Sequence, residues 1–89
     1  MRDFEQDGAL LRSQAKSLVL DLMSATRRCR PGGEGLKQAE IFRACGLDWG
    51  AYEKATSSNQ QYWVVALLRE LQAEGKVEQV KLSGPWCLR

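Results

Sequence analysis

Three polar side chains at helical spacing in the last third of the chain carry the clearest binding chemistry in the sequence. At about 100° per residue, they share one face of a helix predicted over residues 58–74, opposite an apolar arc. The three are Asn59, Tyr62 and Arg69, and the arc holds Val64, Leu67, Leu68 and Leu71. An asparagine amide can bond an adenine edge, an arginine can bond guanine or a phosphate, and a tyrosine hydroxyl can bond a phosphate oxygen. This face is therefore a candidate for contact with the major groove of DNA.

Four further basic and hydroxyl side chains flank this helix. Lys54 and Ser58 lie at its predicted start, where the helix dipole and free backbone amides attract anions. Lys81 and Ser83 lie near the tip of a hairpin predicted after the helix. We expect these four residues to contact phosphates.

The overall charge of the chain is only mildly basic. Its 13 Lys and Arg against 11 Asp and Glu give a net charge of +2, with a pI near 8.5. Nucleic-acid-binding domains are usually more basic, so binding would depend on a local cluster such as Arg27, Arg28 and Arg30. In contrast, Glu70 and Glu74 argue against insertion of the whole third helix into a groove.

The residue types that catalysis and metal binding usually require are missing. The sequence has no histidine, and its three cysteines (Cys29, Cys45 and Cys87) are far apart and form no C-x-x-C pair. Ser-His and Cys-His nucleophiles are thus excluded, and zinc lacks a ligand set. We expect no enzyme, no metal and no cofactor, with the thiols reduced and in or near the core.

The preceding segments predict two helices that would position the third. Asp7 is a candidate N-cap for a first helix of roughly 20 residues, whose apolar side chains recur at helical spacing. Gly35-Leu36 is short enough to form a single bridge to the later hairpin, and residues 37–45 predict a second, shorter helix. One chain of 89 residues can enclose one core, so we expect one domain over residues 9–89 after a tail of residues 1–8.

The end of the chain predicts a hairpin that packs on the helices. Gly75 is placed to stop the third helix, because glycine adopts the left-handed conformation of a helix end without strain. Two short strands then surround a Ser83-Gly84 turn, and Trp86 is expected to anchor the hairpin in the core. The fold class is therefore α+β.

This order of elements resembles a winged helix-turn-helix domain. The segment Leu67-Leu-Arg-Glu-Leu-Gln-Ala-Glu-Gly-Lys-Val77 resembles the end of the recognition helix and the first wing strand of that superfamily. The resemblance covers roughly residues 9–89 and implies three helices with a C-terminal β-hairpin wing. The ending Pro85-Trp-Cys-Leu88 is also similar to the Zα branch, which binds Z-form nucleic acid. That branch carries an asparagine and a tyrosine four residues apart in its helix, where this chain has Val65 and Arg69.

Two functions are compatible with this fold, and the fold alone does not choose between them. The first, which we favour, is binding of double-stranded DNA through helix 58–74 and the wing over residues 76–89. The second is a protein-interaction module in a multi-subunit assembly, for which aromatic side chains that look exposed would form the contact. These aromatics are Trp49, Tyr52, Tyr62 and Trp63.

Membrane and small-molecule partners are not expected. No apolar run approaches the roughly 20 residues of a membrane span, and the first residues lack the apolar segment of a secretory signal. We expect an intracellular protein, nuclear or cytoplasmic.

Overall fold

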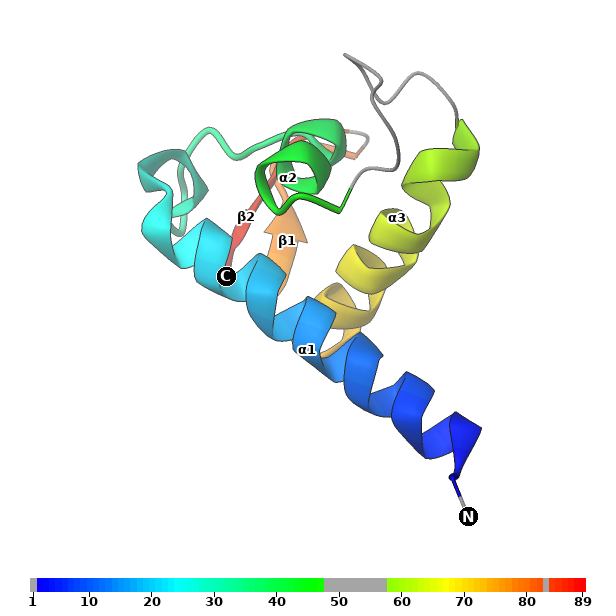
Figure 1. The fold of residues 1–89 in the computed structure, drawn as a ribbon. Coiled ribbons are helices and arrows are strands. Elements are labelled where there is room, and N and C mark those ends of the chain that lie inside the picture. Colours follow the sequence, from blue (N-terminus) through cyan, green and yellow to red (C-terminus); the bar gives the residue numbers. More distant parts are fainter. Residues whose placement is uncertain (1, 48–57, 83) are drawn as a thin grey trace.

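The computed structural model describes residues 2–47, 58–82 and 84–89, and for residues 58–62 it describes the backbone alone. The described residues form three α-helices, a short 3-10 helix and a C-terminal antiparallel hairpin (Figure 1). In chain order these are α1 (Phe4–Ala25), η1 (Arg27–Cys29), α2 (Gln38–Ala44), α3 (Ser58–Ala73), β1 (Val77–Gln79) and β2 (Trp86–Leu88). The predicted α+β class is confirmed. In this part of the chain, no helix has the length and apolar character that crossing a membrane requires.

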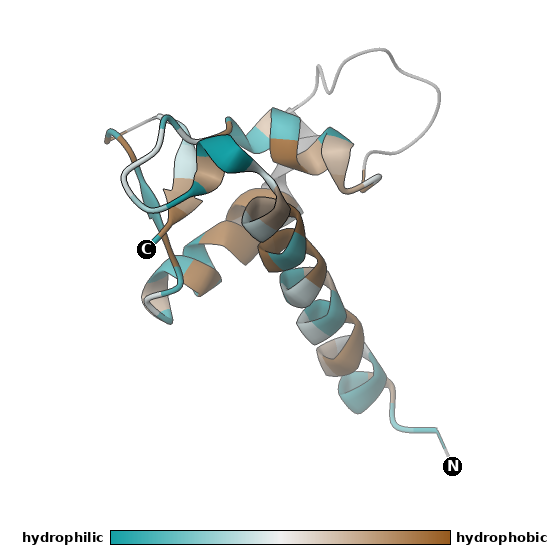
Figure 2. Cartoon of the chain, turned by 90° about the vertical axis from the view of Figure 1, so that its left-hand side faces the viewer, coloured by the Kyte–Doolittle hydropathy of each residue, from teal (hydrophilic) through white to brown (hydrophobic). Residues whose placement is uncertain are grey.

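Helix α1 begins earlier than the sequence pattern indicated. Asp3, not Asp7, is the N-cap: its backbone is extended and its carboxylate accepts a hydrogen bond from the Gln6 amide at 3.1 Å. Asp7 lies inside the helix, with its amide bonded to the Asp3 carbonyl, and it forms an ion pair with Arg2. Residues 4–8, expected as part of a tail, are therefore the first turns of α1, whose N-terminal half extends away from the other elements (Figure 2).

A single backbone bridge joins the segment before α2 to the hairpin, as predicted. Leu36 pairs with Trp86 in antiparallel fashion, with N–O distances of 2.9 and 2.7 Å for the two hydrogen bonds. Gly35 precedes the bridge with a φ of +79°, and a Cβ at this position would lie 2.7 Å from the Trp86 carbonyl oxygen. Only glycine allows the two backbones to approach this closely.

Glycine also ends α3. Gly75 has a φ of +77°, and the next amide, that of Lys76, bonds back to the Leu71 carbonyl at 3.0 Å. This reversal leads directly into β1, which pairs with β2 in the register Val77↔Leu88, Glu78↔Cys87 and Gln79↔Trp86. The predicted helix stop and hairpin are confirmed.

One hydrophobic core joins the helices to the hairpin. The apolar arc predicted on α3 is buried, and Trp86 is fully buried, as expected of an anchor. Cys29 and Cys87 are buried and Cys45 is half-buried, all as free thiols, and burial raises the pKa of Cys29 and of Cys45. The fully buried members from the helices include Val19, Met23, Ile41, Phe42, Val64, Leu68 and Leu71.

Candidate nucleic-acid interface

The structure describes only part of the predicted contact set. Lys54 and Ser83 lie outside the described residues, as do Trp49 and Tyr52 of the aromatic set. Ser58, Asn59 and Tyr62 belong to the first turns of α3, where the backbone alone is described. The side chains of Arg69 and Lys81 are described, and both are exposed.

Arg69 lies against the hairpin. Its guanidinium carbon is 5.2 Å from the centre of the Trp86 ring, and its Nη1 donates to the side-chain oxygens of Gln72, at 3.1 Å, and Gln79, at 3.0 Å. The Gln79 amide nitrogen in turn donates to the Gly84 carbonyl at 3.3 Å. These contacts fix the orientation of the guanidinium and use one nitrogen of a group that carries five N–H donors. Arg69 is thus a preoriented cation at the junction of α3 and the hairpin.

A groove of about 450 Å³ opens beside Arg69, between the start of α2 and the hairpin. Lys37 and Arg69 both line it, and among its described lining residues there is no carboxylate. The remaining lining residues are Gln38, Ala39, Gln79, Leu82, Gly84 and Pro85. An anion entering this groove would meet two positive charges from different elements. Lys37 was not among the predicted contacts, although the predicted bridge at Leu36 places the start of α2 beside the hairpin.

Lys81 lies on a neighbouring surface of the hairpin. It lines a shallow groove with Gln72, Glu78 and Arg89, among others, and does not line the one that contains Arg69. Leu82 follows it and is 99% exposed. The hairpin therefore presents a lysine and an unpartnered leucine side by side.

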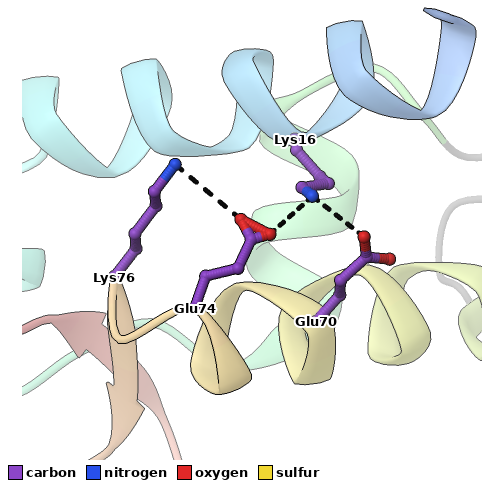
Figure 3. Close-up of polar contacts among 4 residues, drawn as sticks. All are labelled: Lys16, Glu70, Glu74 and Lys76. Atoms are coloured by element: carbon purple, nitrogen blue, oxygen red, sulfur yellow. Dashed lines mark hydrogen bonds and ion pairs between the residues drawn. The ribbon is translucent and has the colours of Figure 1, made fainter. Parts of the chain in front are cut away.

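The two acidic residues of α3 are paired with a cation from α1 (Figure 3). Lys16 Nζ lies 2.9 Å from Glu70 Oε1 and 2.6 Å from Glu74 Oε2, and Lys76 is a further 3.7 Å partner of Glu74. Hydrogen bonds to Glu74 first, and then to Glu70, raise the pKa of Lys16, and the hydrogen bond from Lys16 lowers the pKa of Glu74. Because Lys16 offsets part of their charge, these carboxylates oppose an approaching polyanion less than the sequence alone suggested.

The C-terminal half of α3 lies against two different surfaces. Arg69 contacts the hairpin, whereas Ala66 and Glu70 line an apolar groove of about 350 Å³ between α3 and α1. Trp63, expected to be exposed, also lines this groove but is half-buried, with its ring 5.9 Å from that of Phe42 in an edge-to-face contact. The prediction of an exposed Trp63 was wrong, because α2 covers one side of the ring.

The arginine cluster after α1 is partly neutralised as well. Arg28 lies 3.7 Å from a Glu34 oxygen and 3.4 Å from a Glu40 oxygen. The cluster therefore adds less positive charge to the surface than its three arginines indicate.

In comparisons with known proteins, no family model, curated protein or solved structure matches the chain.

Proposed function

We propose that this chain is a winged-helix module that binds double-stranded DNA through α3 and the hairpin. The observation that carries the proposal is the groove in which Arg69, held by Gln79 and Trp86, faces the same space as Lys37. The order of the elements, with the Leu36–Trp86 bridge before α2, supports a wing that packs against the third helix.

The contacts of Arg69 favour a role for it in binding the backbone of DNA. Its guanidinium is held beside the hairpin, where a wing meets phosphates, so we assign it with Lys37 and Lys81 to phosphate contact. Base contact is left to Asn59 in the first turns of α3, where Tyr62 is a further candidate for phosphate contact. Affinity should then arise mainly from the release of counterions and should fall as salt rises.

Binding to a duplex at several salt concentrations tests the proposal. Each phosphate contact contributes about −0.9 to the slope of log K against log salt, so Arg69→Ala and Lys37→Ala should each reduce the slope by about that amount. Arg69→Lys keeps the charge without the fork geometry and should retain most of the slope. The control is Arg2→Ala, which removes an exposed cation that precedes α1 and lines neither the groove of Arg69 nor that of Lys81. Absence of binding at low salt, or equal slopes in all variants, would exclude this function.

A protein-interaction module is the second candidate, and the exposed Leu82 is the observation that favours it. Leu82 is 99% exposed, and Val80 in the same hairpin is 41% exposed, so together they present apolar surface suited to a pocket on a partner. The same salt series separates the two functions. A domain that stays folded but binds no duplex down to low salt would favour the protein partner.

A further inference from the structure

Helix α1 carries an apolar seam that continues beyond the core of the domain. The seam residues alternate at spacings of four and three, as in a coiled coil, and they are Phe4, Gly8, Leu11, Ala15, Leu18 and Leu22. Ala15 and Leu22 pack against the core, but Phe4 is 73%, Leu11 65% and Leu18 43% exposed. The Arg2 guanidinium lies 5.0 Å from the centre of the Phe4 ring, and the N-terminal half of the seam is otherwise uncovered by the described part of the chain.

The apolar groove between α1 and α3 lies where this seam meets the body of the domain. Leu11 and Ala15 form its α1 wall, and Trp63, Ala66 and Leu67 form its α3 wall. Arg12 and Glu70 lie at its edges. The groove and the exposed seam thus form one continuous surface.

The seam is complementary in shape to a second, antiparallel copy of itself. If Gly8 of one copy faces Leu11 of the other, the same register places Phe4 opposite Ala15, so each of these four layers pairs a large side chain with a small one. The surface above Gly8 is open, since a Cβ there would meet no atom within 4 Å. Phe4 of each copy would then reach the groove beside Ala15 of its partner. A small residue opposite a large one allows close approach and even packing.

The charges beside the seam are complementary in the antiparallel arrangement. Glu5 and Arg12 occupy equivalent positions one heptad apart on the same flank. In an antiparallel pair the same flanks of the two helices meet, so each glutamate lies near an arginine, whereas in a parallel pair each flank meets the opposite flank of the partner and these two residues do not meet. Arg12 forms no ion pair with another described residue, so its charge is available to a partner.

We propose that the chain forms an antiparallel homodimer through the α1 seam, with Phe4 of each copy in the groove of the other. This apolar groove shares no lining residue with the groove of Lys37 and Arg69. Dimer formation and DNA binding can therefore succeed or fail independently.

Sedimentation equilibrium of the full chain over a concentration series tests the dimer. We expect a mass that rises towards twice the 10.0 kDa of the chain, and Leu11→Glu should hold it at the monomer mass. Leu82→Glu is the control, because it changes an exposed leucine of the hairpin that is not part of the seam and should leave the dimer intact. Circular dichroism checks that both variants fold. A monomer at all concentrations, or a dimer that Leu11→Glu does not weaken, overturns the proposal.

A charge exchange tests the antiparallel orientation. Glu5→Arg and Arg12→Glu should each weaken the dimer, because each places like charges together. An equimolar mixture of the two single variants should associate more tightly than either alone, since each contact then joins a glutamate to an arginine. A mixture no tighter than its components would refute the antiparallel register.

Discussion

The close approach at Gly35 predicts that a single added methyl group will destabilise the whole domain. Gly35 combines a φ of +79° with contact to the hairpin, because a Cβ would lie 2.7 Å from the Trp86 carbonyl oxygen and 2.9 Å from the Pro85 Cβ. Gly35→Ala therefore strains the backbone and also forces the bridge apart. The bridge is the backbone link between the segment before α2 and the hairpin.

The expected loss of stability in Gly35→Ala is the sum of the backbone strain and the overpacking against the hairpin. A left-handed conformation costs an ordinary residue about 1–2 kcal/mol, and overpacking costs about 1–3 kcal/mol. The sum, roughly 2–5 kcal/mol, is a large part of the total stability of roughly 4–13 kcal/mol that typical per-residue values give a domain of this length. The midpoint of thermal unfolding should fall by about 8 °C or more.

Gly75→Ala is the matched control for this change. Gly75 has nearly the same φ, +77°, but an added Cβ there meets no atom within 4 Å. Both substitutions reduce the entropy of the unfolded chain equally, so their difference isolates the close approach. We expect Gly35→Ala to cost about 1–3 kcal/mol more than Gly75→Ala in urea unfolding. Equal losses of stability would show that the hairpin does not pack on Gly35 as described.

Two further changes test the packing of α3. Leu68 is fully buried, so Leu68→Ala should cost about 2–5 kcal/mol in urea unfolding, and a loss below about 1 kcal/mol would place it outside the core. The Lys16 contacts predict an effect of pH on stability. Because the pKa of Glu74 is lowered, the ionised carboxylate stabilises the fold at pH values above its ordinary pKa of 4.5. This contribution is lost as the pH falls through the lowered pKa. In alkaline solution the raised pKa of Lys16 has the matching effect. The charged Lys16 contributes its full stabilisation below its ordinary pKa of 10.5, and this contribution is lost as the pH rises through the raised pKa. Lys16→Met should therefore lose less stability than the native chain between pH 5 and pH 3, and an equal loss would contradict the role of this contact.

The features that local sequence could predict are those that local physics controls. The glycine stop at Gly75 and the buried arc of α3 depend on backbone conformation and on helical period, which can be read from a few neighbouring residues. The first residue of α1 could not be predicted from local sequence. Asp3 and Asp7 are both suitable caps, and the turns between them have few core contacts, so no buried periodicity shows where the helix begins.

The features that the sequence did not predict depend on contacts between distant segments. Lys16 is 54 residues from Glu70 and 58 from Glu74, and only the packing of α1 on α3 brings them together. The spacing of the two glutamates by four residues was a signal that one cation could bind both, but it did not identify the lysine. The position of Arg69 depends likewise on the hairpin, which follows it in the chain.

The contacts of Arg69 and Glu70 restrict the part of α3 that a ligand can reach. On the hairpin side Arg69 is held by Gln79 and Trp86, and on the α1 side Glu70 is paired with Lys16. The C-terminal half of the helix is therefore flanked on both sides. If the chain binds DNA as proposed, base contact belongs to the first turns of α3, and Arg69 sets the position of the phosphate backbone on the wing. Alanine at Asn59 should then change which sequences are preferred, whereas alanine at Arg69 should weaken binding to all of them alike.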